Sequence, residues 1–261
     1  MAYDTIELSI SHGIARLTLN RPDAANGIDL ALANDLRDAT FAINRDPSVR
    51  VVLLTGNGAR FCGGGDVKGF GNVDDLPTHL REILAGFHTA VAQLVRGDAL
   101  VVAAVQGSAA GAGIGLVGLS DYVVSAESTK YVMAYTGIGL TPDGASSWFL
   151  PRTIGLKRAL ELTVTNRVLS AREALDWGLV TEVVPDDELT ARADAVAAHF
   201  AGGPTRAYAA AKRLLHTSLE HSFETHLHDE GEAIANASAT ADGQEGITAF
   251  IEKRKPSFTG E

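Results

Sequence analysis

Two stretches rich in glycine and alanine are the parts of this sequence best suited to chemistry. Residues 63–66 read GGGD and follow an apolar run at 51–54, whereas residues 107–113 read GSAAGAG and follow an apolar run at 101–105. Small side chains leave backbone N–H groups uncovered, and at the start of a helix such groups can bind a developing negative charge. The sequence therefore predicts two corners able to hold an anion.

Asp143 is the acidic residue with the strongest case for a catalytic role. It lies between Pro142 and Gly144, directly before an apolar segment that contains Trp148 and Phe149. Apolar surroundings raise the pKa of a carboxyl group, which makes it a better base near neutral pH. A helix-capping aspartate fits the same pattern equally well, so the residues alone leave both interpretations open.

Four other residues near the glycine stretches are weaker candidates. Asp66 could act as an acid, but an aspartate at such a position more often closes a turn or caps a helix, and Lys68 could meet a phosphate group or stay solvated. Cys62 has no recognisable basic partner that would form a thiolate, so it is interpreted as a small packing residue. Ser108 lies one position too early for the G-x-S-x-G nucleophile motif.

Two further motifs are interpreted as structural. GIGLVG at residues 113–118 matches the dinucleotide-binding fingerprint, but the acidic residue expected about 20 positions later is missing, and close helix packing explains these glycines better. The histidine-rich segment 216–232 places His226 and His228 two positions apart, which is not one helix face, so a solvated surface is favoured over a metal site. Neither a metal nor a separate cofactor is predicted.

The apolar pattern predicts an α/β fold in which the order strand, glycine corner, helix occurs twice. A β-hairpin is expected from the alternating residues 4–10 and 14–19, a helix from Asp29 to Pro47, a buried strand at 51–54 and a loop over 72–79. Later helices are expected at roughly 80–96, 145–150, 155–163, 171–177 and 186–200. Later strands are expected from 101 onward, where the apolar run 101–105 begins, and at 122–125, 131–134 and 181–184. A Gly-Gly-Pro break then separates residues 1–202 from an all-helical region, 203–261.

Composition limits the classes of partner. The chain has 261 residues, 46% of them hydrophobic, which is ample for a large core. A net charge of -10 argues against a nucleic-acid surface. The single cysteine suits a reducing compartment, and neither a signal peptide nor a membrane-spanning run is recognisable, so a cytoplasmic protein without membrane attachment is expected.

Several segments, taken in order, resemble the crotonase family, the enoyl-CoA hydratase/isomerase superfamily. Similarity runs along almost the whole chain. The segments that carry it are LTLNRPDAAN at 17–26, ARFCGGGDVKGF at 59–70, VQGSAAGAGIGLVGLSDYVV at 105–124, IGLTPDGASSWFLPRTIG at 138–155 and AFIEKRKPSF at 249–258. This resemblance implies a spiral of ββα turns with a C-terminal helical trimerisation region, an acyl-CoA thioester as substrate, and a homotrimer or dimer of trimers.

The same resemblance assigns roles to individual residues. The two backbone N–H groups of an oxyanion hole for the thioester carbonyl fall on Gly65 and Ala112, and the neighbouring Gly64 and Gly111 fall in the substrate site. An enolate oxygen gains charge only after a proton leaves, so preorganised donors of this kind stabilise the reaction selectively.

Contacts with coenzyme A are also implied. Lys68 matches a basic residue near the pantetheine and phosphates. Phe250 and Lys253 match an aromatic residue and a lysine that reach the adenine and phosphate of a neighbouring subunit's ligand. Asp23, however, stands where a basic residue often follows Arg-Pro.

The positions that match the two glutamates of the hydratases are Gly115 and Tyr135. Glycine cannot transfer a proton, and a phenol with an ordinary pKa near 10 is a poor base, although Tyr135 can still contact substrate. Asp143 matches the single acid of the Δ3,Δ2-enoyl-CoA isomerases and the ring-1,2-epoxyphenylacetyl-CoA isomerases. An acyl-CoA isomerase that uses Asp143 as its acid and base is therefore favoured. The alternatives are a hydratase with a non-standard acid/base set and a catalytically silent acyl-CoA binding protein.

Overall fold

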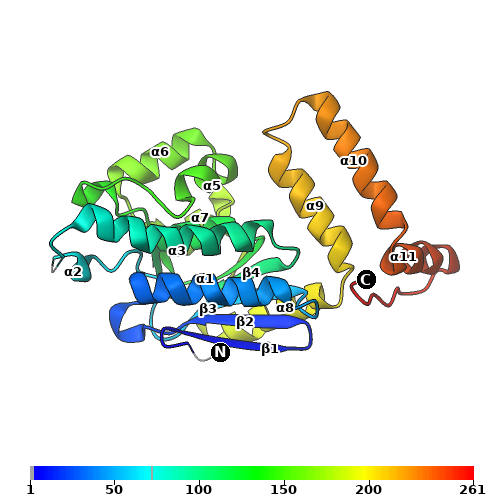
Figure 1. Ribbon diagram of the computed structural model, residues 1–261, viewed down its shortest axis with the longest axis horizontal. Helices are drawn as coiled ribbons and strands as arrows, with labels where there is room; N and C mark the ends of the chain where they lie inside the picture. The colour runs from blue at the N-terminus through cyan, green and yellow to red at the C-terminus, as the bar shows by residue number, and fades with distance from the viewer. Residues whose placement is uncertain (1–2, 72) are drawn as a thin grey trace.

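A central six-stranded sheet organises the computed structural model, which describes residues 3–71 and 73–261 (Figure 1). Its first two strands are antiparallel and the rest pair in parallel. In spatial order the strands are β1 (Ile6–Ser11), β2 (Ile14–Leu19), β3 (Val51–Gly56), β4 (Leu100–Val105), β6 (Tyr122–Ala126) and β9 (Glu182–Val184). A second sheet has the order β5 (Ser108–Ala110), β7 (Lys130–Val132) and β8 (Leu169–Ser170). The predicted α/β class is confirmed.

The opening hairpin forms where the alternating pattern predicts it. Its two-residue turn consists of His12 and Gly13, both with positive φ, at 51° and 78°. A turn with two positive φ values has a twist that matches the twist of the flanking strands. Glycine is favoured in such a turn because it adopts a positive φ readily. The register pairs Ile6 with Leu19 and ends with Ser11 opposite Ile14.

Buried strands β3 and β4 separate two layers of helices. Val52 and Leu54 face one side of the sheet, where α1 (Leu30–Arg45) and α3 (Leu76–Arg96) lie next to each other (Figure 1). Val51 faces the other side, which is covered by α8 (Leu189–Ala201). Strands buried on both faces read as continuous apolar runs, so these strands could be found from the sequence.

The start of α3 differs from the sequence prediction. Of the loop expected over 72–79, residue 72 lies outside the described residues, and the helix already begins at Leu76. The Asp75 side chain caps it by accepting the backbone N–H of Thr78 at 3.1 Å, and Pro77 occupies the first turn. The first turn has no apolar periodicity, so the pattern alone missed it.

The remaining elements connect these layers and carry the site. The short strands β5 and β8 were not expected, because two- or three-residue strands leave almost no periodic signal. The other elements are η1 (Pro22–Ala24), α2 (Val67–Phe70), α4 (Ala112–Leu119), η2 (Thr136–Ile138), α5 (Ser146–Thr153), α6 (Leu156–Thr165), α7 (Ala171–Trp177) and η3 (Asp186–Glu188).

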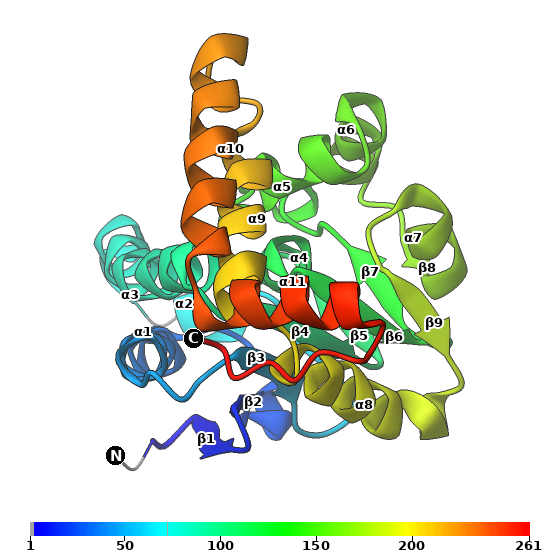
Figure 2. The same ribbon diagram turned by 90° about the vertical axis from the view of Figure 1, so that its right-hand side faces the viewer.

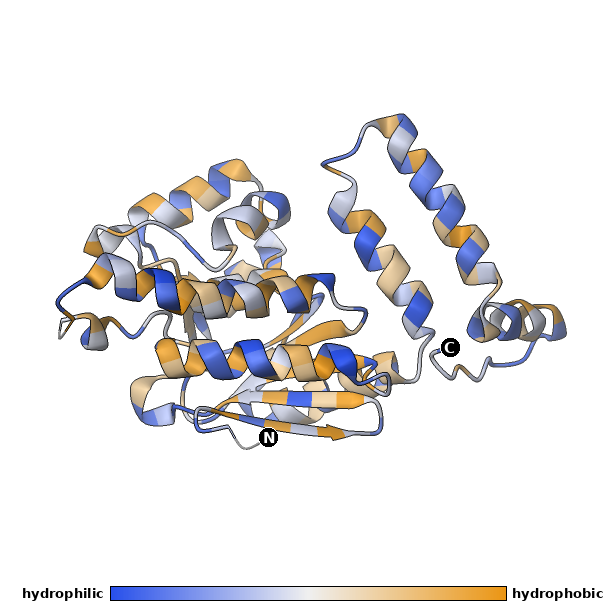
Figure 3. Cartoon of the chain, viewed as in Figure 1, coloured by the Kyte–Doolittle hydropathy of each residue, from blue (hydrophilic) through white to orange (hydrophobic). Residues whose placement is uncertain are grey.

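Three helices follow the Gly-Gly-Pro break: α9 (Thr205–Thr217), α10 (Phe223–Ser238) and α11 (Ala241–Glu252). Figures 1 and 2 show α9 and α10 as a pair that projects from the sheet, with α11 near its base. Apolar residues recur among polar ones along this region in Figure 3. Within the described ranges 3–71 and 73–261, no helix combines the length and apolar character needed to cross a bilayer. The division at 202/203 stays a prediction.

Lys212 fastens α9 to the core. Its side chain is buried, and its ammonium group donates to the Asp121 carboxylate at 2.8 Å and to the carbonyl oxygens of Leu94 at 3.0 Å and Ala99 at 3.4 Å. All three donors of the ammonium group are thereby satisfied, which offsets the cost of burying its charge.

Lys212→Met is expected to lower the free energy of unfolding by about 3–5 kcal/mol, because it leaves the Asp121 carboxylate without its buried partner. Urea unfolding followed by circular dichroism measures this change. Arg213→Met is the matched control: it removes the exposed pair with Asp98, for which about 0–1 kcal/mol is expected. Equal losses in the two variants would contradict the anchoring role of Lys212.

Candidate active site

Backbone pairing holds the two glycine corners next to each other. Cys62 and Ala109 form a parallel bridge between the loop after β3 and strand β5. The Ala110 N–H donates to the Cys62 carbonyl at 2.9 Å, and the Cys62 N–H donates to the Ser108 carbonyl at 3.2 Å. Two segments that are more than 40 positions apart in the sequence thus meet at one edge of the fold.

Close backbone approach explains the glycines at this meeting point. Gly64 has a φ of +92°, and a Cβ there would lie 2.9 Å from the Ala110 carbonyl oxygen; Gly111 has a φ of +51°. The next residue in each corner is Gly65, which is exposed, and Ala112, which is the first residue of α4. Within the part of the chain that the structure describes, neither of these two N–H groups donates to a protein acceptor. Such a pair can stabilise an oxyanion.

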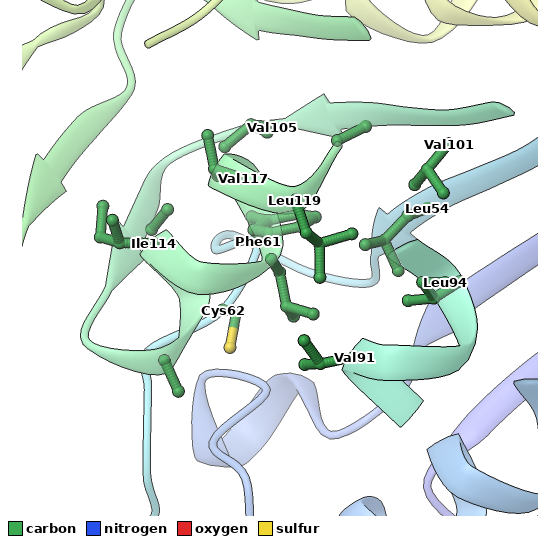
Figure 4. Packing of buried hydrophobic residues seen from close by; sticks show 14 of the residues in the cluster. Leu54, Phe61, Cys62, Val91, Leu94, Val101, Val105, Ile114, Val117 and Leu119 are labelled. Carbon is green, nitrogen blue, oxygen red and sulfur yellow. The ribbon is translucent and has the colours of Figure 1, made fainter. Parts of the chain in front are cut away.

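Cys62 contributes packing to this region. Figure 4 shows its sulfur among buried side chains that include Phe61, Val91 and Ile114. Burial raises the pKa of the Cys62 thiol to about 11, so the thiol stays protonated near neutral pH. The interpretation as a packing residue is confirmed.

Asp143 lies on a turn against the start of α4. The hydroxyl of Tyr135 donates to its Oδ1 at 2.5 Å. Burial raises the pKa of the Asp143 carboxyl above its usual range, although the hydrogen bond from Tyr135 opposes part of that rise. The carboxylate does not cap α5: Ser146, the first residue of α5, donates its N–H to the Asp143 backbone carbonyl at 3.0 Å. The capping interpretation is therefore wrong for this side chain.

Residues around the Asp143 turn bring it to the glycine corner. A Cβ at Gly144 would lie 3.7 Å from the Ala112 Cα, and a Cβ at Gly111 would lie 3.7 Å from the Tyr135 ring. The Gly144 N–H donates to His88 Nε2 at 3.2 Å, so α3 supports the turn from the other side. Sequence reasoning missed His88, because nothing in the helical pattern of α3 distinguishes it from other polar positions.

Gly115 is pressed against the same turn. A Cβ at Gly115 would lie 2.1 Å from the Gly144 carbonyl oxygen, closer than any real Cβ contact. A Cβ at Gly113 would likewise lie 2.6 Å from the Cys62 carbonyl oxygen, and a Cβ at Gly118 would lie 2.9 Å from the Phe149 Cβ. These contacts explain the apparent dinucleotide fingerprint as close helix packing. They also leave no room for a glutamate at position 115.

Asp66 and Lys68 differ in how the structure uses them. The Asp66 carboxylate pairs with the Arg21 guanidinium at 3.0 Å, and Arg21 also pairs with Asp29 at 2.9 Å. Asp66 does occupy the N-cap position of α2, and its backbone carbonyl accepts the Gly69 N–H at 3.0 Å. Among the described residues its carboxylate makes no capping bond to that helix. Lys68 lies on α2, directly after the first glycine corner, and is exposed.

Phe250 and Lys253 do not join the site within one chain. Both belong to the end of α11, and Phe250 is 85% exposed. Figure 1 places α11 and α2 at opposite ends of the long axis of the molecule. Any contact between these residues and a ligand at the glycine corners requires a second copy of the chain.

Two free backbone N–H groups beside a buried carboxyl can together stabilise an oxyanion and move a proton. The chain belongs to the enoyl-CoA hydratase/isomerase family, whose sequence model matches residues 9–261. The crotonase resemblance is therefore confirmed, together with the α/β fold and its C-terminal helices; trimerisation stays a prediction.

Individual relatives carry the names of two different reactions. The chain is 38% identical to "Probable enoyl-CoA hydratase" of Rhodobacter capsulatus, with all of both chains covered. It is 36% identical to "1,2-epoxyphenylacetyl-CoA isomerase" of Escherichia coli, over 98% of this chain and 100% of the other. Among solved structures, an enoyl-CoA hydratase from Bacillus anthracis matches with a TM-score of 0.92 and 32% identity, over 99% of this chain and 100% of the other.

Proposed function

We propose that the protein isomerises an unsaturated or ring-epoxide acyl-CoA thioester through an enolate. For an unsaturated ester, Asp143 removes a proton from one carbon of the acyl group and returns it to another, which moves the double bond. The N–H groups of Gly65 and Ala112 hold the charge that develops on the thioester oxygen. The observation that carries the proposal is the buried Asp143 carboxylate, fixed by Tyr135 beside the first residue of α4.

The hydrogen bond from Tyr135 gives the two carboxylate oxygens of Asp143 different roles. Tyr135 binds Oδ1, which leaves Oδ2 of Asp143 to carry the proton. Burial, followed by the charge of Asp143, raises the pKa of the Tyr135 phenol, so Tyr135 remains a donor rather than a base. One carboxylate is sufficient when a proton only moves between two carbons of the same substrate.

The two corner donors are expected to contribute a large part of the rate enhancement. Removal of one oxyanion donor from an enzyme of this kind typically costs about 2.7–4 kcal/mol of transition-state stabilisation. Gly65 and Ala112 donate from the backbone, and the corner backbone is already fixed by the bridge between Cys62 and Ala109. Little reorganisation is therefore needed when the enolate forms.

Hydration is the second candidate function, and the relative named as a probable hydratase favours it. In this case the Tyr135 hydroxyl and the Asp143 carboxylate would orient a water molecule in place of the two glutamates. The missing glutamate position weighs against it, because Gly115 cannot accommodate a side chain. A catalytically silent acyl-CoA binding protein would share the corners but leave the raised pKa of Asp143 without a use.

A substrate comparison separates the three functions. The protein is incubated with a 3-enoyl-CoA and, separately, with a 2-enoyl-CoA and a ring-epoxide CoA ester, and products are followed by mass spectrometry. We expect the 3-enoyl or epoxide ester to isomerise faster than the 2-enoyl ester is hydrated. Faster hydration would support the hydratase, and tight binding without any turnover would support the silent protein.

The rate should fall as the pH falls through the pKa of Asp143, because only the ionised carboxylate accepts a proton. Burial raises that pKa, so the loss is expected at a higher pH than the usual aspartate value of about 3.9. Tyr135→Phe removes a hydrogen bond that lowers the pKa of Asp143, so its inflection in a kcat/KM profile should move to higher pH. An unmoved inflection would contradict the pairing.

We propose further that the active protein is a homotrimer or a dimer of trimers. Apolar side chains are exposed on α9, α10, α11 and the turn between α9 and α10, and a second copy would cover them; these are Leu215, Leu219, Phe223, Leu227, Ile234 and Phe250. Sedimentation should give three or six times the chain mass of 27.3 kDa. Phe250→Ala is expected to raise KM for CoA esters with little change in kcat. A fully active monomer would contradict the proposal.

A further inference from the structure

Two histidines and an aspartate meet where the chain turns from α9 into α10. One potential ligand atom from each of His221, His226 and Asp229 lies within 4.8 Å of the other two. His221 precedes Ser222, the N-cap of α10, whereas His226 and Asp229 are three positions apart on that helix and share a face. The sequence pattern emphasised His226 and His228 instead, and that spacing concealed the grouping.

Hydrogen bonds within the group do not satisfy all of its polar atoms. Nδ1 of His221 lies 2.8 Å from an Asp229 oxygen. Nδ1 of His226 is buried and has no hydrogen-bond partner within residues 3–71 and 73–261, and the whole side chain is only 18% exposed. Leaving a buried polar atom unpaired is costly, so such an atom calls for an explanation.

We propose that His221, His226 and Asp229 bind a zinc ion. Imidazole nitrogens and a carboxylate oxygen are ordinary zinc ligands, with bonds of about 2.0–2.2 Å and neighbouring ligand atoms about 3.4 Å apart in a tetrahedron. Starting from separations of up to 4.8 Å, small side-chain rotations reach that geometry. A water molecule occupies the fourth position.

Glu230 supports the same site. Its carboxylate lies 3.5 Å from Nε2 of His226, one helical turn along α10. Zinc-binding histidines are commonly oriented by a carboxylate at their second nitrogen, which raises their basicity. The buried, unpaired Nδ1 of His226 is then the nitrogen available to the metal.

The role of this ion is structural. His221 belongs to the turn, and Asp229 belongs to α10, so one ion ties the turn to the second helix of the projecting pair. The acid Asp143 lies instead on the spiral core beside α4. Zinc should therefore raise the thermal stability of the chain without changing the turnover of acyl-CoA.

Zinc titration of the full-length, tag-free, chelator-treated protein tests the site. A competing chromophoric chelator measures affinity, and thermal unfolding measures stabilisation. One zinc per chain is expected, with binding at least about tenfold weaker in His226→Asn and Asp229→Asn. His228→Asn is the matched control, because His228 is exposed on the same helix and lies outside the group.

His221→Asn provides an additional test, because His221 is exposed in the turn and its replacement does not disturb α10. Circular dichroism establishes that each variant keeps its helical content. Absence of zinc binding by the wild type would overturn the proposal. Wild-type affinity in both His221→Asn and Asp229→Asn, or an equal loss in the His228→Asn control, would overturn it as well.

Discussion

Replacing Asp143 with asparagine is expected to lower kcat/KM for isomerisation by about 10²–10⁴-fold, the usual contribution of a general acid or base. Asparagine keeps the size of the side chain and can still accept the Tyr135 hydroxyl, which donates to Oδ1 in the native protein. Only the ability to take up and return a proton is lost. Affinity for the CoA ester should therefore change little, and the loss should appear in kcat.

The stability of the same variant offers an internal check. A carboxyl group whose pKa is raised by folding binds its proton more tightly in the native state, so the native state loses stability as the pH rises above the unfolded pKa of about 3.9. Asp143→Asn lacks that penalty at neutral pH. It should unfold at the same temperature as the wild type or higher, which separates loss of catalysis from loss of fold.

Asp66→Asn is the matched comparison, because Asp66 follows the other glycine corner and could have been the acid. Its carboxylate is paired with Arg21 at 3.0 Å, so its replacement should weaken the local structure and cost much less activity. Full isomerase activity in Asp143→Asn would rule out the proposed role of Asp143. A larger loss in Asp66→Asn than in Asp143→Asn would transfer the role to Asp66.

Local patterns in the sequence predicted most of the framework. The apolar runs of β3 and β4 follow from burial on both faces, and the turn at His12 and Gly13 follows from the need for positive φ. The first turn of α3 and the short strand β5 carry no periodicity, so their existence depends on caps and pairing partners far along the chain. Such long-range terms are invisible to a local pattern.

The residues of the candidate site could be proposed from the sequence, but most of their contacts could not. The sequence marked Gly65, Ala112 and Asp143, and the structure brings the Asp143 turn to the start of α4. The sequence did not indicate that His88 on α3 accepts the Gly144 N–H, nor that Arg21 pairs with Asp66. These contacts join elements that are distant in sequence, and one polar residue on a helix resembles another until the tertiary fold selects it.

Gly115→Ala is expected to be a strongly damaging single-methyl change next to the candidate site. The added Cβ would lie 2.1 Å from the Gly144 carbonyl oxygen, and this neighbour is backbone held between α4 and Phe87. Overpacking typically costs about 1–3 kcal/mol, and a rigid backbone neighbour places this variant at the upper end. Urea unfolding measures the loss.

The same methyl group should also impair catalysis, because the turn it displaces carries Asp143. A misplacement of about 1 Å can cost about 100-fold in rate, so kcat should fall even in the folded fraction. Gly115→Glu, which would restore the residue type found in the hydratases, should fail for the same steric reason and yield no hydratase. Hydratase activity in that variant would show that the Asp143 turn can move to accommodate a glutamate at position 115. The structural argument against hydration would then fail.

Gly231→Ala is the matched control for both measurements. Gly231 lies within α10, and a Cβ there would meet nothing within 4 Å in the same chain. Alanine in an exposed helix stabilises by about 0.5–1 kcal/mol relative to glycine, so this variant should gain stability and keep full activity. If Gly→Ala lowers the free energy of unfolding at position 115 and raises it at position 231, the contact with Gly144 explains the need for glycine at position 115, and helix propensity does not. If both variants proved equally stable and active, the close approach of α4 to the Asp143 turn could not be what excludes a glutamate there.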